Sequence, residues 1–334
     1  MRAMVLARAR SVEESPLQLQ DVPLPTPGAG EVRVRVGCCG ICHTDLHTVE
    51  GDLPLPRLPL IPGHQIVGVV DALGPGSHVL KRGDRIGIPW LHSTDGTCDY
   101  CVRGFENLCD NAQFTGYHVD GGYAEFTIVR EDFAQAIPEH FSDENAAPLL
   151  CAGIIGYRSY RLSGARFGSR LGLYGFGASA HLVLQLARHE GCEVYVVTRA
   201  QSHRDLALQL GAVWVGAAED MPPGQLDSAI IFAPAGSLVP LALRALRKGG
   251  TLALAGITMS PIPQMDYSLL YHERVIRSVA NSTRDDCREF LSLAVDAGLR
   301  TEVEVFQLQH ANRALQALKK SEIKGAAVLR VAPG

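Results

Sequence analysis

From about residue 169 to residue 280, short apolar runs alternate with segments of helical periodicity, and this alternation constrains the fold more than any other feature. The strand-like runs are RLGLYG, EVYVVT, VWVG, SAIIFA, TLALAG and VIRSVA, and the helical segments between them are ASAHLVLQLARHE, SHRDLALQLGA and SLVPLALRALRKGG. Strands that are joined by helical crossovers pair in parallel. The sequence therefore predicts an α/β fold with a doubly wound parallel sheet of about six strands.

A glycine-rich turn, Gly175-Phe-Gly177-Ala-Ser-Ala180, follows the first of these strands and opens the first helix. Gly175 permits the tight turn, Gly177 lets the backbone approach a pyrophosphate, and Ala180 is small enough for the helix to pack closely on the sheet. In this strand–turn–helix context the pattern predicts a dinucleotide-binding Rossmann domain. The alternative is a glycine turn in a parallel sheet that binds no nucleotide.

The second strand ends in Val197-Thr198-Arg199, where a nicotinamide-binding domain normally carries an acid for the adenosine ribose. No carboxylate stands there, and Arg199 would attract a 2′-phosphate. We therefore expect an NAD(P)(H) site with a preference for NADP(H). The alternative is that Arg199 is a solvated surface arginine.

Residues 1–150 have a different texture, with many Gly and Pro residues and short β-type runs such as Glu31–Val36 and Ile66–Val70. This pattern predicts an irregular, mainly β domain. The last fifty residues read as helix, strand, helix, strand, and we expect residues 285–334 to complete the first domain. The predicted organisation is thus a domain of residues 1–150, completed by about 285–334, and a cofactor domain of residues 151–284.

Composition excludes several classes of partner. The 334 residues are 46% hydrophobic and 20% charged, which is enough apolar content for two cores. A net charge of -4 gives no electrostatic attraction for nucleic acid or an anionic membrane. Without a secretory signal or a membrane-spanning apolar run, a cytoplasmic location is expected. In that reducing compartment the nine cysteines would be metal ligands, reactive thiols or buried apolar residues.

Three of these cysteines, Cys98, Cys101 and Cys109, follow the spacing C-x2-C-x7-C within one loop. Asp95 lies three residues upstream and is a chemically acceptable fourth ligand. The segment predicts a closed tetrahedral structural zinc site. The alternative is a mobile thiol loop without metal.

A second set of metal-ligand types is spread along the chain as Cys42, His64 and Cys151. Two thiolates and one imidazole would leave the fourth position of a zinc ion open, which is typical of a catalytic site. Spacing alone does not show that the three converge, so buried cysteines and a core histidine remain the alternative.

Taken together, these motifs identify a family. The segments GICHTDLH, GH at 63–64, the cysteine loop, GYHVDGGYAEF, APLLCAG and GFGASAH make the whole chain resemble the zinc-containing medium-chain alcohol dehydrogenases. The resemblance implies a GroES-like catalytic domain interrupted by a Rossmann domain, with the active site between them. It also implies two zinc ions per chain, a small alcohol or aldehyde substrate, and a homodimer or homotetramer.

The resemblance assigns roles to individual residues. Cys42, His64 and Cys151 correspond to the catalytic zinc ligands, and Asp45 to the acid that orients His64. The remaining correspondences are Thr44 and His47 with the proton relay, His43 with a cofactor pyrophosphate contact, and Leu53 and Trp90 with the substrate pocket.

Four positions depart from the family pattern. Gln65 replaces a glutamate that follows the zinc histidine, and Asp95 replaces the first cysteine of the structural zinc loop. Thr198 replaces the ribose-binding acid. Ala326, after Gly325, stands where some relatives have an arginine for the pyrophosphate.

The implied reaction is hydride transfer between an alcohol and the nicotinamide, with the alcohol proton passing from Thr44 through the cofactor ribose to His47. Three alternatives remain at this stage: a zinc-free NADPH quinone or enone reductase, a non-catalytic nucleotide-binding protein, and a polyol or threonine dehydrogenase. The last of these tends to use a glutamate where this chain has Cys151.

Overall fold

The computed structural model describes residues 1–331. The chain divides into two compact units. Unit 1 comprises residues 1–151, 281–292 and 301 onward, and unit 2 comprises residues 152–280 and 293–300. Helix α8 (Arg284–Asp296) contributes its first part to unit 1 and its last part to unit 2.

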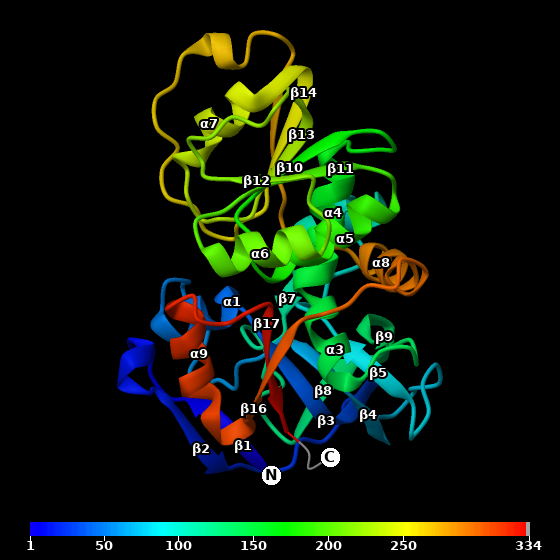
Figure 1. Ribbon diagram of the computed structural model, residues 1–334. Coiled ribbons are helices and arrows are strands. Elements are labelled where there is room, and N and C mark those ends of the chain that lie inside the picture. The colour runs from blue at the N-terminus through cyan, green and yellow to red at the C-terminus, as the bar shows by residue number, and fades with distance from the viewer. Residues whose placement is uncertain (332–334) are drawn as a thin grey trace. The chain divides into compact units, whose positions relative to one another are not determined.

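Unit 2 is built on one six-stranded sheet with the order β12-β11-β10-β13-β14-β15, and every neighbouring pair is parallel (Figure 1). The strands are β10 (Arg170–Tyr174), β11 (Glu193–Val197), β12 (Trp214–Gly216), β13 (Leu226–Ile231), β14 (Leu246–Leu254) and β15 (Val275–Ser278). These strands confirm the doubly wound parallel sheet predicted from the sequence. The order reverses between β10 and β13, the position at which such sheets bind ligands.

Helices α5, α6 and α7 connect the strands, and α4 precedes the sheet. Their bounds are α4 (Ala152–Ser163), α5 (Ala178–His189), α6 (Gln201–Gln209) and α7 (Leu238–Ala245). Helix α5 forms because its apolar residues recur at helical spacing, so that Leu182, Val183 and Leu186 are buried against the unit's interior.

One boundary predicted from the sequence was wrong. The helix expected over SLVPLALRALRKGG ends at Ala245, and Leu246 already belongs to β14. Leu246 is fully buried and pairs with Leu226, whereas the exposed residues that follow it form an irregularity in the ladder before Thr251 pairs with Ser228. Burial of the leucine in the sheet therefore overrides the local helical pattern.

Unit 1 is mainly β. Its largest sheet has the order β16-β17-β3-β4-β5-β9, with β8 also paired to β3 (Figure 1). The strands are β3 (Glu31–Ile41), β4 (Gln65–Leu73), β5 (Arg85–Ile88), β8 (Phe126–Arg130), β9 (Gln135–Ala136), β16 (Val303–Gln307) and β17 (Ala326–Arg330). Two smaller sheets pair β1 (Arg2–Leu6) with β2 (Leu17–Asp21), and β6 (Leu91–Ser93) with β7 (Gln113–Phe114).

The helices of unit 1 are short. They include α1 (His43–Glu50), α2 (Asp99–Val102), α3 (Asp143–Ala146) and α9 (Ala311–Lys319), with single 3-10 turns at Val12–Glu14, Glu106–Leu108, Glu131–Phe133, Ala147–Leu150 and Leu308–His310. Strand β3 continues past the expected residue 36 to Ile41, because β4 and β17 both pair with its second half.

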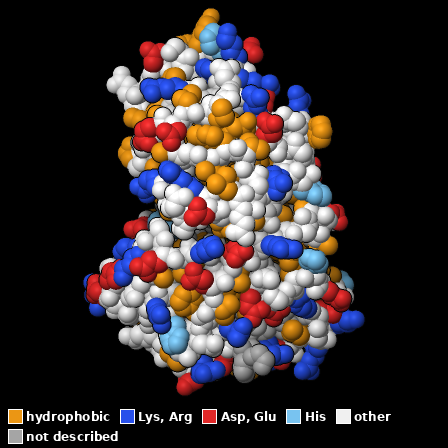
Figure 2. All heavy atoms as spheres, in the orientation of Figure 1, with side chains coloured by type: hydrophobic (Ala, Val, Ile, Leu, Met, Phe, Trp, Pro, Cys, Tyr) orange, Lys and Arg blue, Asp and Glu red, His pale blue; other side chains and the backbone are white. Residues whose placement is uncertain are grey.

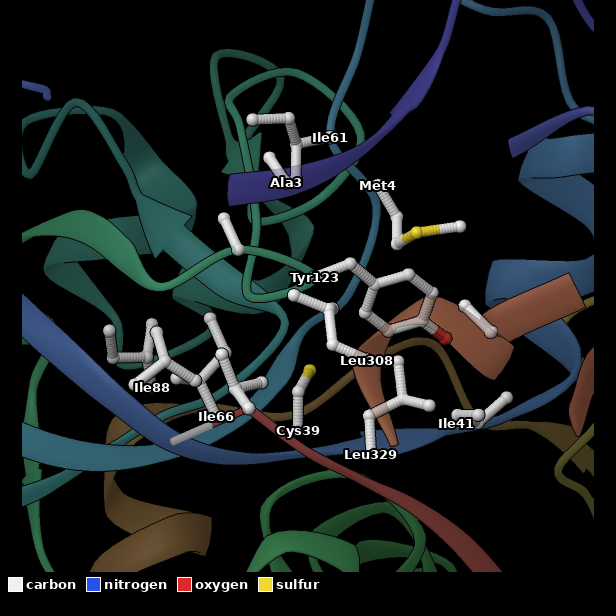
Figure 3. Packing of buried hydrophobic residues seen from close by; sticks show 14 of the residues in the cluster. Ala3, Met4, Cys39, Ile41, Ile61, Ile66, Ile88, Tyr123, Leu308 and Leu329 are labelled. Carbon is white, nitrogen blue, oxygen red and sulfur yellow. The ribbon is translucent and has the colours of Figure 1, made fainter. Parts of the chain in front are cut away.

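The core of unit 1 centres on Tyr123, whose ring is fully buried. Figure 3 shows Met4, Cys39 and Leu308 around it, contributed by segments far apart in the chain. Strand β17 pairs with β3 up to Ile41, which lies just before α1. The N–H of Met4 donates to the carbonyl of Tyr123, and the N–H of Tyr123 donates to the carbonyl of Pro62, just before β4. This core therefore fixes the start of α1 and the entry to β4. Both segments carry residues of the candidate active site.

Acidic and basic side chains are interspersed on the face of the molecule shown in Figure 2. Within residues 1–331, no helix is both long and apolar enough to cross a membrane.

Candidate active site and metal centres

The segment Cys42-His-Thr-Asp45 forms the start of α1, and its side chains cap the helix. The backbone N–H of Thr44 donates to Cys42 Sγ at 3.3 Å, and Asp45 Oδ2 accepts the backbone N–H of Cys42 at 2.8 Å. This reciprocal arrangement is a capping box in which a thiol takes the place of the usual hydroxyl. The cap fixes Cys42 and Asp45 relative to the helix.

His64 approaches Cys42 from the loop before β4. Its Nε2 lies 3.4 Å from Cys42 Sγ, and its Nδ1 lies 3.1 Å from Asp45 Oδ1. Gly63 makes this loop possible, because its φ is +99° and a Cβ there would lie 2.4 Å from the Tyr123 ring. The carboxylate of Asp45 therefore orients the imidazole so that Nε2 faces the thiol.

Cys151 completes the group from the end of the 3-10 turn at Ala147–Leu150. One ligand atom from each of Cys42, His64 and Cys151 lies within 4.8 Å of the others. Two sulfurs and one imidazole nitrogen at this separation fit a zinc ion and leave its fourth position for another ligand.

The electrostatics of this triangle also suit a cation. A hydrogen bond from Cys151 lowers the pKa of Cys42 well below that of a free thiol, and the same bond raises the pKa of Cys151. Burial opposes charge on His64, but the charges of Asp45 and Cys42 raise its pKa to about 10. The group thus holds protons that a bound metal ion would displace.

The side chains with predicted relay roles lie on α1. His47 Nδ1 is 2.8 Å from Asp52 Oδ2, and the rings of His43 and His47 are 6.4 Å apart. Thr44 is half-buried and His43 is exposed. Asp52 was not anticipated from the sequence, since nothing in the residues Gly51-Asp52 by themselves indicates that the carboxylate turns back to the helix.

Of the two predicted pocket residues, Trp90 lies next to the metal triangle. Its ring is 4.8 Å from that of His64, with the two planes at 74°. Leu53 is half-buried in the loop that follows α1. Gln65 is buried beside His64 at the start of β4, and its Nε2 finds no hydrogen-bond partner within residues 1–331.

The second cluster lies in the cysteine loop. One ligand atom from each of Asp95, Cys98, Cys101 and Cys109 lies within 4.8 Å of the others. Asp95 Oδ1 accepts the backbone N–H groups of Thr97 and Cys98, each at 2.9 Å. Three sulfurs and one carboxylate at this separation fit a closed tetrahedral zinc site.

Asn111 holds the carboxylate of this cluster from the other side. Its Nδ2 donates to Asp95 Oδ2 at 2.9 Å, and this bond, with those from the two backbone groups, lowers the pKa of Asp95. Asn111 was missed in the sequence, because a side chain that supports a ligand has no fixed spacing from it.

The glycine turn in unit 2 has the geometry that the motif requires. Gly175 has a φ of +90°, and a Cβ there would lie 2.9 Å from the backbone nitrogen of Ala233. A Cβ at Gly177, the N-cap of α5, would meet nothing within 4 Å, and Ala180 is fully buried. The open space at the helix N-terminus fits an anionic group such as a pyrophosphate.

The end of β11 presents Thr198 and Arg199 next to each other. Thr198 is nearly buried and its carbonyl accepts Arg204 Nε at 3.0 Å, whereas Arg199 is exposed. The guanidinium of Arg204 therefore lies against the backbone of Thr198, while Arg199 stays exposed.

Comparisons with known proteins agree with this description. Residues 28–139 match the family model of the alcohol dehydrogenase GroES-like domain, and residues 180–296 match that of the zinc-binding dehydrogenases. A probable alcohol dehydrogenase, AdhA, of Mycobacterium tuberculosis (strain CDC 1551 / Oshkosh) is 47% identical over 99% of this chain and 97% of its own length. An alcohol dehydrogenase of Geobacillus stearothermophilus is 40% identical over 97% of this chain and 99% of its own length.

Solved structures give the same result. A cinnamyl alcohol dehydrogenase of Sorghum bicolor superposes with a TM-score of 0.90 at 28% identity, covering 98% of this chain and 97% of its own. The alcohol dehydrogenase of Aeropyrum pernix gives 0.88 at 28% identity, with 99% of this chain and all of its own covered. The chain therefore belongs to the zinc-containing medium-chain alcohol dehydrogenases, with a GroES-like domain and a Rossmann domain.

Proposed function

We propose that this alcohol dehydrogenase interconverts primary or aryl alcohols and their aldehydes, depends on zinc, and prefers NADP(H) to NAD(H). The observation that carries the proposal is the triangle of Cys42, His64 and Cys151 with the buried carboxylate of Asp45 behind the imidazole. A zinc-free reductase or a nucleotide-binding protein without activity would have no use for this donor set. The third ligand is a cysteine, in contrast to the glutamate of polyol dehydrogenases.

In this proposal unit 1 is the catalytic domain and unit 2 the cofactor domain. Cys42, His64 and Cys151 would hold the catalytic zinc, whose charge favours loss of the alcohol proton near neutral pH, and the nicotinamide would accept or return the hydride. Asp45 keeps Nε2 of His64 directed at the metal position by accepting from Nδ1.

Thr44 and His47 of α1 form the proposed proton relay. The Thr44 hydroxyl would accept the alcohol proton and release its own, and the ribose of a bound cofactor would connect Thr44 to His47, which exchanges the proton with solvent. Asp52 holds Nδ1 of His47, which fixes the orientation of the ring. His43, on the exposed side of the same helix, is the proposed contact for the cofactor pyrophosphate.

Zinc content together with initial rates tests the metal assignment. Two zincs per chain, and turnover of benzyl alcohol, ethanol and their aldehydes, are expected for the wild-type protein. Cys42→Ala should lose one zinc and all activity, whereas Cys192→Ala, which alters a buried cysteine of unit 2 outside both clusters, should keep both. A Cys42→Ala variant with wild-type turnover would show that the metal assignment is wrong.

The coenzyme preference rests on the absence of a carboxylate at Thr198 and on the exposed guanidinium of Arg199. Arg204, a second cation in this segment, donates to the Thr198 carbonyl. Arg199→Ala should lower kcat/KM for NADPH by about tenfold, the magnitude of one charge-assisted phosphate contact, and leave that for NADH unchanged. The exposed Arg244 on α7 supplies the control, Arg244→Ala. Equal wild-type efficiency with NADPH and NADH would refute the preference.

From the family we also propose a homodimer or homotetramer, which light scattering of the purified protein tests.

The cysteines support a further proposal, a cytoplasmic location. None of the nine cysteines forms a disulfide, and two clusters of them suit metal binding, which requires reduced thiols.

A further inference from the structure

An aromatic cluster in unit 1 extends outward from the candidate zinc site. It consists of Trp90, Phe114, Tyr117 and His118, and Trp90 joins it to the ring of His64. The indole of Trp90 stacks on Phe114, with centroids 5.0 Å apart and planes at 11°, and its centroid lies 5.7 Å from that of Tyr117. Phe114 thus covers one face of an indole that remains only half-buried.

The backbone holds the cluster in place. Strand β6, which follows Trp90, pairs with β7, which ends at Phe114, and the N–H of Thr115 donates to the Trp90 carbonyl at 2.9 Å. The ring of His118 is fixed as well, since its Nδ1 accepts the backbone N–H of Phe114 at 3.1 Å. These bonds fix the backbone of Trp90 and Phe114, and the two rings restrict each other by stacking.

Two polar contacts connect the segment of residues 117–120, which follows β7, to the loop after α1. The Tyr117 hydroxyl donates to the carbonyl of Pro54, and Arg57 forms an ion pair with Asp120. This loop carries Leu53, the other residue with a proposed place in the substrate pocket. The aromatic cluster therefore fixes both Trp90 and the backbone next to Leu53.

We propose that Phe114 and Tyr117 are specificity-determining positioning residues that make the site prefer planar aryl and conjugated alcohols and aldehydes. This inference rests on the proposed function. Neither residue is a catalytic residue, because each acts through another group: Phe114 holds the indole of Trp90 beside His64, and Tyr117 holds the loop of Leu53. A fixed indole offers a flat surface to a planar ring, whereas ethanol has no ring to stack on it.

The effect expected from this geometry is moderate. A favourable aromatic pair contributes an amount of free energy that corresponds to about a two- to tenfold change in an equilibrium or specificity constant. Phe114→Leu should therefore lower the ratio of kcat/KM for benzyl alcohol to kcat/KM for ethanol by about two- to tenfold. The change should lie mainly in KM for benzyl alcohol. Phe114→Tyr, which keeps an aromatic ring on Trp90, should have the same benzyl alcohol to ethanol ratio as the wild type.

The chain has only two tryptophans, which makes a readout independent of activity available. In a Trp214→Phe background, the fluorescence of Trp90 reports on its own surroundings alone. Quenching by acrylamide should increase in Phe114→Leu, because the face covered by Phe114 becomes accessible. Tyr117→Phe removes only the hydrogen bond to Pro54. It should lower the preference for benzyl alcohol over ethanol without exposing the indole. It also serves as a second variant if Phe114→Leu folds poorly.

The control is Phe167→Leu, which alters a phenylalanine of unit 2 that is 87% exposed, and it should change neither readout. An unchanged substrate ratio in both Phe114→Leu and Tyr117→Phe, with zinc content intact, would overturn the inference while the dehydrogenase assignment stands. A wild-type protein that prefers ethanol to benzyl alcohol would also overturn it. A wild-type protein with neither activity would remove the proposed function and this inference together.

Discussion

The pairing of Glu106 with Arg284 gives the most quantitative prediction about the stability of unit 1. Glu106 lies in the cysteine loop between Cys101 and Cys109, is 8% exposed, and is separated from Arg284 by 178 positions. Its carboxylate accepts the backbone N–H of Arg284 at 2.8 Å, Nε at 3.0 Å and Nη2 at 2.6 Å. The guanidinium also lies over the ring of Phe133, 4.3 Å from its centroid.

Arg284→Met removes the guanidinium but keeps an apolar chain over Phe133. Leaving a buried carboxylate without its cation costs about 3 to 5 kcal/mol. The backbone N–H of residue 284 still donates to Glu106, and the arginine side chain is 31% exposed, so the lower end applies. We expect the free energy of unfolding of unit 1 to fall by about 3 kcal/mol.

Urea unfolding followed by Trp90 fluorescence in a Trp214→Phe background measures this change, since Trp90 lies in unit 1 and Trp214 in unit 2. The control is Arg288→Met on the same helix, where the pair with Asp285 is 67% exposed on both sides and should contribute less than about 0.5 kcal/mol. A Glu106→Gln, Arg284→Met double mutant should lose less than the sum of the single losses. If Arg284→Met is no less stable than Arg288→Met, the reasoning from buried charge is wrong.

Three further predictions follow from single contacts. Burial lowers the pKa of His181 from 6.5, the ordinary value, to about 4. Between these pH values the unfolded chain binds a proton that the folded chain does not. Unit 2 should therefore lose about 3 kcal/mol of stability as the pH falls from 6.5 to 4. Urea unfolding of His181→Leu across that range should remove this loss, while the exposed His189→Leu should keep it. Gly63→Ala should lower the free energy of unfolding by about 3 kcal/mol or more and release the catalytic zinc, because the new Cβ meets the Tyr123 ring at a φ of +99°. Gly76→Ala, which has open space around it at a φ of +76°, should cost only about 1 kcal/mol. Thermal unfolding and zinc content compare the two variants, and equal losses would contradict the steric argument. Asn111→Ala should weaken zinc binding in the cysteine loop about tenfold, because it removes the hydrogen bond to Asp95. Chelator competition measures the zinc affinity. An affinity equal to that of the neighbouring variant Asp110→Ala would exclude this role of Asn111.

Local sequence signals predicted the parts of the fold that short-range physics controls. The period of the apolar residues predicted the strands and helices of unit 2, and Gly175 was predicted to make the turn where the structure has a φ of +90°. The spacing of Cys98, Cys101 and Cys109 predicted a ligand cluster because one short loop carries all three. The end of α7 was predicted wrongly, since the competing burial of Leu246 against Leu226 is not a local property.

The sequence by itself thus determined the two kinds of domain, the glycine turn and the identity of the candidate ligands. Only the tertiary structure decided that Cys42, His64 and Cys151 share one site, that Glu106 meets Arg284, and that Phe114 stacks on Trp90. Period and spacing act over a few residues, because they depend on backbone geometry. Contacts between distant positions depend on strand register and core packing, which exist only once the whole chain has folded.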